Sequence, residues 1–348
     1  MLRTPEDGEP NFYSMTFPQP ILVFGPRKAG TSLLHNLLDG GSELVMIPGE
    51  LKLHPLRVIK EEASCNPARH YLQYGRLDFE RLIEWHDEQP QANLEYAFDG
   101  LSVEQTREAF EVEGYVAQLS EMLAAPPREE SAVVLARDFV DRDVAAFLSS
   151  VKQPPANLKF WASKEVSKKP EITLKFWRQL YPESRIVYLV RQPEFIVRSI
   201  LNNRRRKGIR VSRRMIWAHC VEAQHFINFA YEASHWPRDE RPIFLSYEEM
   251  TTAPETVMQR VAQDLGLTFE PILAKPTTLG VPIVVRTSSR ATTEVFQQES
   301  SWQKGLTRRE ILIIQTYRLL SPLIFRRQRE TLVPYATMQA RLNELTAE

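Results

Sequence analysis

One glycine loop constrains this chain more than any other feature. The loop, Gly25-Pro26-Arg27-Lys28-Ala29-Gly30-Thr31-Ser32, lies between an apolar run, Ile21–Phe24, and a helical pattern of leucines that stops at Gly40. A strand, a glycine loop and a helix in this order place backbone N–H groups at a helix N-terminus, where they can bind phosphate. The sequence therefore predicts a phosphate-binding loop after the first strand.

The position of the lysine in this loop separates two classes of enzyme. ATP-binding loops carry a lysine directly after the second glycine, followed by a serine or threonine that holds magnesium. Here Thr31 stands after the second glycine, and the lysine is Lys28, inside the loop. This placement favours a single 5′-phosphate, with the lysine charge beside the bond that breaks.

Five apolar runs predict buried strands, and helical patterns lie between most of them. The predicted strands are Ile21–Phe24, Glu43–Ile47, Leu158–Ala162, Arg185–Val190 and Pro242–Leu245. The predicted helices between and after them are Thr173–Tyr181, Pro193–Leu201, Met215–Trp236 and Pro254–Leu265. Alternating strands and helices predict an α/β fold with a central parallel five-stranded sheet flanked by helices.

In such sheets, ligands bind beyond the carboxyl ends of the strands. Each of the five predicted strands is followed by a segment with a charged or hydrogen-bonding side chain. These segments are the glycine loop, Pro48–His54, Ser163–Glu165, Arg191–Pro193 and Ser246–Met250. We therefore expect the functional site at this edge of the sheet.

The segment after the fourth strand carries a second phosphate signal. Arg191-Gln192-Pro193 is followed eight residues later by Ser199, inside the next predicted helix. An arginine at a strand end can make bidentate contacts with a phosphate. With the glycine loop, this segment resembles the sulfotransferases that use 3′-phosphoadenosine 5′-phosphosulfate (PAPS), and the loop is most similar to G-P-x-K-x-G-T-x of the carbohydrate branch. The resemblance implies a P-loop-like sulfotransferase fold from about Pro20 to about Leu320.

The resemblance also implies which residues hold PAPS. The glycine loop would bind the 5′-phosphate, and the segment around Arg191 would bind the 3′-phosphate. The segment Tyr247–Met250 resembles the one that lies near adenine, and Ser301–Leu306 resembles a C-terminal loop that closes over the nucleotide. The implied donor-binding residues are Arg27, Lys28, Ala29, Gly30, Thr31, Ser32, Arg191, Ser199, Tyr247, Trp302 and Lys304.

Sulfuryl transfer is an in-line displacement that needs a base, positive charge at the bridging oxygen and a rigid hold on the nucleotide. By the resemblance, Glu50 is the base, three residues past the second strand and next to the glycine loop. His54 is the second candidate, because imidazole is a common proton acceptor near neutral pH. Lys28 would act at the bridging oxygen, and Lys164 would contact the sulfuryl oxygens or hold the acceptor. The reaction requires no metal.

The segment from about Ile59 to Val151 matches no motif of the family. It reads as helical, for example over Leu77–Glu84 and Ser131–Val151. We expect one sulfotransferase domain over residues 1–348, with an N-terminal extension at residues 1–19. The segment 59–151 is then a helical insertion that shapes the acceptor site.

Composition excludes several other classes of protein. The chain has 348 residues, of which 43% are hydrophobic and 25% charged, as is typical of a globular protein. Its zero formal net charge gives no overall field for nucleic acid or a membrane. No apolar run reaches the ~20 residues of a membrane span, and no signal-peptide core or disulfide framework is present. We therefore expect a soluble, cytoplasmic enzyme. The seven histidines show no metal-ligand spacing, so no metal site is expected.

The sequence does not decide the role of a run of cations after the fourth strand. Seven Lys or Arg residues lie between Arg204 and Arg214. They could hold the 3′-phosphate, attract an acidic hydroxyl-bearing acceptor, or form a solvated loop.

Three alternatives to a carbohydrate sulfotransferase stay open at this point. The first is a metal-dependent P-loop kinase or nucleotidase, and the second is a nucleotide-binding scaffold without turnover. The third is a sulfotransferase that acts on protein tyrosine, a lipid or a small natural product. The sequence indicates no oligomeric state.

Overall fold

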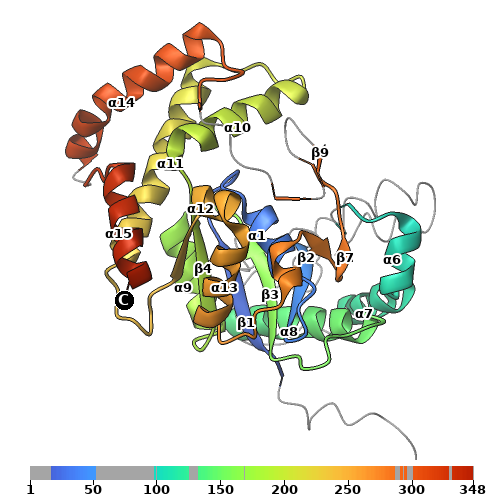
Figure 1. The fold of residues 1–348 in the computed structure, drawn as a ribbon. Coiled ribbons are helices and arrows are strands. Elements are labelled where there is room, and N and C mark those ends of the chain that lie inside the picture. The colour runs from blue at the N-terminus through green and yellow to red at the C-terminus, as the bar shows by residue number, and fades with distance from the viewer. Residues whose placement is uncertain are drawn as a thin grey trace, which may run out of the picture.

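The computed structural model describes residues 17–51, 98, 100–124, 132–167, 169–286, 291–292, 294–295, 301–328 and 331–347. At its centre lies a five-stranded sheet in the order β2-β3-β1-β4-β5 (Figure 1). All neighbouring strands are parallel, which confirms the predicted α/β architecture. The strands are β1 (Gln19–Phe24), β2 (Leu44–Glu50), β3 (Phe160–Glu165), β4 (Arg185–Val190) and β5 (Ile243–Ser246).

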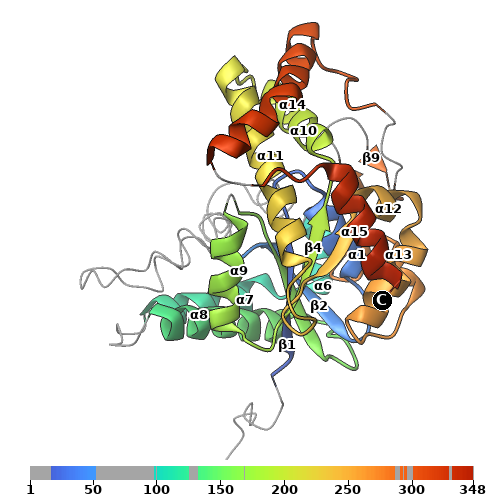
Figure 2. The ribbon, with the colours of Figure 1, turned by 90° about the vertical axis from the view of Figure 1, so that its left-hand side faces the viewer.

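Both faces of the sheet are buried, because alternate side chains of each strand enter two different cores. Leu22 and Phe24 pack in one core with residues of α7 (Val112–Ala124), α8 (Ala132–Ser150), α9 (Pro170–Leu180) and α11 (Arg213–Ala233). Figure 2 shows α9 and α11 on one side of the sheet, and α1 (Thr31–Leu38), α12 (Tyr247–Thr252) and α13 (Pro254–Asp264) on the other.

The second core holds the neighbouring side chains of the same strand. Ile21 and Val23 pack there with α1 (Thr31–Leu38), α12 (Tyr247–Thr252) and α13 (Pro254–Asp264). A strand that is apolar at every position needs helices on both sides. Continuous apolar runs in the sequence therefore predict strands of a sheet that is covered on both faces.

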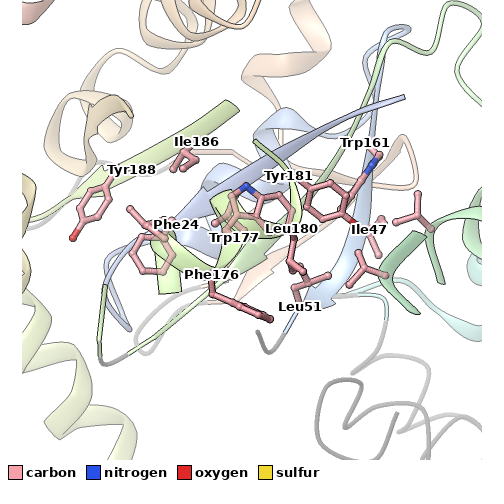
Figure 3. Packing of buried hydrophobic residues seen from close by; sticks show 14 of the residues in the cluster. Phe24, Ile47, Leu51, Trp161, Phe176, Trp177, Leu180, Tyr181, Ile186 and Tyr188 are labelled. Atoms are coloured by element: carbon pink, nitrogen blue, oxygen red, sulfur yellow. The ribbon is translucent and has the colours of Figure 1, made fainter. Parts of the chain in front are cut away.

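Aromatic rings lock α9 against β3 (Figure 3). The rings of Trp161 and Trp177 lie 5.9 Å apart, and Tyr181 lies 5.7 Å from Trp161 and 4.8 Å from Trp177. Such pairs contribute about 0.5–1.5 kcal/mol each beyond the burial of their area. This packing fixes β3, whose carboxyl end carries Lys164.

Four further α-helices belong to the described part of the chain. They are α6 (Val103–Ala109), α10 (Pro193–Arg206), α14 (Arg308–Gln328) and α15 (Tyr335–Ala347). A capping box begins α14, since Thr307 and Glu310 exchange hydrogen bonds there. None of the described helices is both long and apolar enough to cross a bilayer.

Several element boundaries differ from those read in the sequence. The predicted helix Ser131–Val151 is present as α8, whereas Leu77–Glu84 lies outside the described residues. The helix predicted over Pro193–Leu201 continues to Arg206 as α10. The first part of the cationic run is therefore helical. Two small hairpins, β6–β7 (Thr277–Thr278 and Val281–Pro282) and β8–β9 (Val285–Arg286 and Ala291–Thr292), and helix α15 were not predicted.

Candidate active site

The five strands end at one edge of the sheet, and a predicted site residue lies at or just after the end of each strand. In the order of the sheet these are Glu50 on β2, Lys164 on β3, the glycine loop after β1, Arg191 after β4 and Tyr247 after β5. The parallel arrangement therefore gathers residues that are far apart in the sequence into one row.

Two residues of the glycine loop adopt left-handed backbone conformations at the start of α1. Lys28 and Gly30 both have positive φ angles, 69° and 106°. Gly30 is the N-cap of α1, no side chain caps the helix, and its first turn contains no acidic residue. The first N–H groups of a helix lack intrahelical partners, and the helix dipole favours an anion beside them.

Gly30 is required for steric as well as conformational reasons. A Cβ atom at this position would lie 2.3 Å from two ring carbons of Tyr247. Tyr247 itself is buried at the start of α12. The loop and the end of β5 are thus packed directly against each other.

Arg191 joins the loop to β4 and to Tyr247. Its Nη1 donates a hydrogen bond of 2.7 Å to the carbonyl oxygen of Lys28. Its guanidinium lies 3.9 Å from the centre of the Tyr247 ring, in a cation–π arrangement. Arg191 is only 8% exposed, so part of its role is to hold the loop in place.

Glu248 supports this side of the site, and the sequence reading did not single it out. Its Oε1 accepts a hydrogen bond of 3.2 Å from the backbone N–H of Gln192, and its Oε2 accepts one of 2.7 Å from the Tyr335 hydroxyl. The Tyr-Glu-Glu-Met segment contains this glutamate. However, only the fold shows that it ties α15 to the residue after Arg191.

On the other side of the loop, Lys164 contacts the start of α1. Its Nζ donates a hydrogen bond of 3.0 Å to the Ser32 hydroxyl. Lys164 was predicted in a segment after the third strand, but it lies inside β3, next to the last residue, and is 5% exposed. The strand is longer than its apolar run because β1 and β2 pair with it along its polar end.

The predicted placement of Glu50 needs a correction. Glu50 is the last residue of β2 and pairs with Lys164, so β3 separates it from the strand that precedes the glycine loop. The register shifts between Met46 and Glu50, where Pro48 and Gly49 interrupt the ladder and Gly49 has φ 85°. In the sequence, Pro48 and Gly49 indicate the end of the strand. In the structure they form a bulge that redirects Glu50.

Glu50 and Lys28 are close enough to interact electrostatically. Burial is the largest cause that lowers the pKa of Lys28, followed by the nearby charges of Arg206, Arg27 and Lys207. The carboxylate of Glu50 acts in the opposite direction and raises this pKa. The loop lysine therefore lies in a partly buried, strongly cationic environment. An anionic ligand would offset the repulsion between these cations and stabilise the charged form of the lysine.

Arg27 lies next to Lys28 and contacts α11. Its Nη2 lies 3.8 Å from Oε2 of Glu222, which also lies 3.2 Å from Nδ1 of His219. Among the described residues, Nε of Arg27 and Nε2 of His219 are buried without a hydrogen-bond partner. Sequence reasoning missed Glu222 and His219, because nothing local in a long amphipathic helix shows that it reaches the loop.

The predicted C-terminal loop lies against α10. Arg198 donates a hydrogen bond of 2.9 Å to the carbonyl of Ser301, and Arg205 donates one of 2.8 Å to the carbonyl of Gly305. The loop is therefore held on the helix that follows Arg191.

Three predicted donor residues belong to these two segments. Ser199 follows Arg198 on α10 and is half-buried, and Lys304 is exposed. Trp302 is half-buried and packs against the apolar cluster between α10, α11 and α14. The tryptophan thus has a packing role in addition to the one predicted for it.

His54, the second candidate base, lies outside the described residues. Within the part of the chain that the structure describes, no three His, Cys, Asp or Glu side chains form a group that could hold a metal ion.

Comparison with solved structures shows the fold. The sulfotransferase domain of the olefin synthase from Synechococcus PCC 7002 has a TM-score of 0.51 at 14% identity, over 88% of this chain and 96% of that one. The sulfotransferase domain from the curacin biosynthetic pathway has 17% identity and a TM-score of 0.45, over 86% and 98% of the two chains. Retinol dehydratase, solved with androsterone and the inactive cofactor PAP, has 14% identity and a TM-score of 0.37, over 88% and 82%.

Sequence comparison gives the assignment. No curated protein matches the chain significantly. The sequence profile described as the sulfotransferase family matches residues 20–271, which is more than half of the chain and includes all five strands except Gln19, the first residue of β1. The matched region also includes the glycine loop, Glu50, Lys164, Arg191 and Tyr247. The chain therefore belongs to the sulfotransferase family of enzymes.

Proposed function

We propose that this enzyme transfers the sulfuryl group of PAPS to an acceptor hydroxyl by in-line displacement, with a carbohydrate as the favoured acceptor. The observation that carries the proposal is the environment of Lys28. This lysine is partly buried inside the glycine loop, with Arg27, Arg206 and Lys207 near it and the Glu50 carboxylate opposing them. A cationic group at the leaving oxygen and a carboxylate near it are what a displacement at sulfur needs.

The residues present fit an anionic nucleotide donor. The N-terminus of α1 offers backbone N–H groups, and Arg27 has a buried Nε without a partner among the described residues. Arg191 and Ser199 would hold the 3′-phosphate, and the Tyr247 ring would lie near the base. When bound, PAPS supplies an activated sulfuryl group on a phosphate leaving group.

In the proposed reaction, Glu50 accepts the proton of the acceptor hydroxyl while the oxygen attacks sulfur. Lys28 donates to the oxygen that bridges sulfur and phosphate, where negative charge grows as the bond breaks. Lys164 stays hydrogen-bonded to Ser32, so it orients the start of α1 and adds positive charge beside the sulfuryl group. The acceptor oxygen becomes the sulfate ester, and the nucleotide leaves as the 3′,5′-bisphosphate.

The cationic run bears on the choice of acceptor. Arg206 and Lys207 are exposed and close enough to lower the pKa of Lys28. They can therefore attract an acidic acceptor to the mouth of the site. Arg205 cannot, because it is bound to Glu310, Asn202 and the Gly305 carbonyl.

An acceptor screen with radiolabelled PAPS tests this function. Hydroxyl-bearing sugars, acidic glycans, a tyrosine peptide, a lipid alcohol and small natural products would be offered in parallel. We expect label transfer to at least one carbohydrate, and a thermal shift with adenosine 3′,5′-bisphosphate but a smaller one with ATP and magnesium. Transfer only to a non-carbohydrate acceptor would correct the acceptor class. A larger shift with ATP and magnesium, and no label transfer, would favour a kinase or nucleotidase.

A further inference from the structure

One side of α14 exposes a row of leucines to solvent. Their spacing of i, i+7, i+8 and i+11 places them on one side of the helix. We call this set the leucine stripe; its members and exposed fractions are Leu312 (63%), Leu319 (80%), Leu320 (42%) and Leu323 (60%). Among the described residues, eight large apolar side chains are exposed, and half of them belong to the stripe.

The opposite side of α14 already contributes to the core. Ile314, Tyr317 and Phe325 are buried in the cluster with α10 and α11, and the Tyr317 ring lies 5.2 Å from that of Trp217. The packing of α14 therefore does not need the leucine stripe. An exposed apolar stripe of this size on a folded domain indicates an interaction surface.

Arginines frame the leucine stripe at both ends. Arg308 and Arg309 lie in the first turn of α14, Arg326 lies near its end, and all three are exposed. The sequence has no Asp or Glu from Ile311 to Gln328, and Glu310 is buried and bound to Arg205. Cations in a first turn oppose the helix dipole, so the two arginines there do not stabilise α14.

A second group of cations lies at the same end of the molecule. We call it the cationic tip, because α10 ends and α11 begins there; its exposed members are Arg206, Lys207, Arg210, Arg213 and Arg214. Figures 1 and 2 show this tip and the N-terminal part of α14 at the same end in both views. Although the chain has zero formal net charge, this end is strongly positive, and the partner must be anionic.

A second copy of the chain does not match this surface. Antiparallel pairing of two α14 helices would place Arg308 and Arg309 of one copy beside Arg326 of the other. Parallel pairing would place identical arginines together. Either arrangement brings like charges into contact, which is unfavourable.

An anionic bilayer matches the surface better than an acidic protein does. Anchors in protein interfaces are mainly Trp, Tyr and Arg, and Leu is under-represented among them; here the apolar contacts are leucines alone. A lipid surface accepts leucines at the boundary of headgroups and acyl chains and arginines at the phosphates.

We propose that the leucine stripe and the cationic tip dock this enzyme on the surface of an anionic lipid membrane. Helix α14 has 21 residues, and at 1.5 Å per residue it is about 32 Å long. It would lie along the surface with its leucines inserted and would not cross the bilayer. The docking requires neither a particular donor nor a particular acceptor, so it can fail or hold independently of the proposed reaction.

The test is co-sedimentation of the full-length chain with lipid vesicles. One set of vesicles is phosphatidylcholine alone, and the other is phosphatidylcholine mixed with phosphatidylserine. We expect the protein to pellet with the mixed vesicles and not with phosphatidylcholine alone, and to be released as salt rises. No binding to the mixed vesicles, or equal binding to both sets, would overturn the proposal.

Three variants locate the surface. The double change Leu319→Gln with Leu323→Gln keeps good helix formers and should weaken binding at least about tenfold, because two inserted side chains are lost. Arg308→Gln with Arg309→Gln should weaken binding and reduce its salt dependence. Val134→Gln, at a position on α8 that is 50% exposed, is the matched control and should bind as the parent does.

Melting temperature and nucleotide-induced thermal shift confirm that each variant is folded. Unchanged vesicle binding by the leucine double variant would remove the stripe from the membrane surface. Sedimentation equilibrium without lipid gives the other decisive result. A dimer that dissociates in the leucine double variant would assign the stripe to a second copy of the chain and contradict the membrane proposal.

Discussion

The two sides of the candidate active site are built differently. At the ends of β1, β4 and β5, side chains hold one another in place: Arg191 binds the Lys28 carbonyl, and Tyr247 packs on Gly30. At the ends of β2 and β3, Glu50 follows a bulge at the edge strand of the sheet, and it is half-exposed. The first side, which we call the cradle, is held by contacts between its residues, whereas the second presents the proposed base, Glu50, from the edge of the sheet. We therefore expect substitutions of Arg191 and Ser199 to alter mainly nucleotide affinity, and those of Glu50 and of the loop lysine Lys28 to alter mainly turnover.

The largest expected effect is that of Glu50→Gln. The change keeps the size of the side chain and removes its basicity, so turnover should fall by about 10²–10⁴. PAPS binding should stay nearly intact, because a carboxylate does not attract an anionic donor. Steady-state rates and nucleotide titration measure the two effects. His54→Ala is the control: if it abolishes turnover while Glu50→Gln stays active, His54 is the base.

Lys28→Ala should lower turnover by about 10²–10³, because one donor to the transition state is lost. The affinity for the product nucleotide should fall by a smaller factor than turnover does. Burial and neighbouring cations lower the pKa of Lys28, so its charge is lost at a lower pH than that of an ordinary lysine. Nucleotide affinity of the free enzyme should accordingly decline as the pH rises through this lowered pKa, and Lys28→Arg should remove the decline. Near-normal turnover of a folded Lys28→Ala variant would instead make Lys28 a solvated loop residue.

Gly30→Ala tests how closely the cradle is packed. The new Cβ would meet the Tyr247 ring at 2.3 Å, and the φ of 106° is unfavourable for alanine. The free energy of unfolding should fall by about 2–5 kcal/mol from strain and overpacking together. Gly208→Ala is the matched control, because φ is 68° there but no atom lies within 4 Å; its cost should be only about 1–2 kcal/mol. Equal losses in denaturant unfolding would show that the ring can move aside.

Arg191→Ala and Ser199→Ala should separate loop support from phosphate binding. Loss of Arg191 should weaken binding of adenosine 3′,5′-bisphosphate by about 1.5–3 kcal/mol. Because Arg191 also donates a hydrogen bond to the Lys28 carbonyl, we expect Arg191→Ala to weaken binding of adenosine 5′-phosphate as well. Ser199→Ala should affect only the nucleotide with a 3′-phosphate. Calorimetric titration gives both values, and equal losses of the two nucleotides in Ser199→Ala would remove this serine from the 3′-phosphate site.

The smallest effect concerns the cationic tip. Arg206→Gln with Lys207→Gln should raise the KM of an acidic acceptor a few-fold and flatten its salt dependence, because screened attraction is what these charges supply. The KM of a neutral acceptor is the control and should not change. Arg205 is left out because it holds α14 and the C-terminal loop. An acidic acceptor whose KM and salt profile stay the same would show that the two residues do not recruit the acceptor.

The sequence by itself determined the parts of this protein that depend on local order. Apolar runs between helical patterns predicted a covered parallel sheet, and Gly25–Ser32 predicted the turn that begins α1, because both signals are short-range. The family also followed from local motifs, since Lys28 and the Arg191 segment each lie within a few residues of a strand end.

Only the tertiary structure decided which of these residues meet. The order β2-β3-β1-β4-β5 places Lys164 against Ser32 and moves Glu50 one strand away from the glycine loop, and no spacing in the sequence encodes that order. The contact of Glu222 with Arg27 depends in the same way on where α11 crosses. Zero net charge suggested no membrane field, yet folding brings the cations between α10 and α11 to the same end of the molecule as the first turn of α14. Net charge is a sum over the chain, whereas an electrostatic field depends on where the fold places each charge.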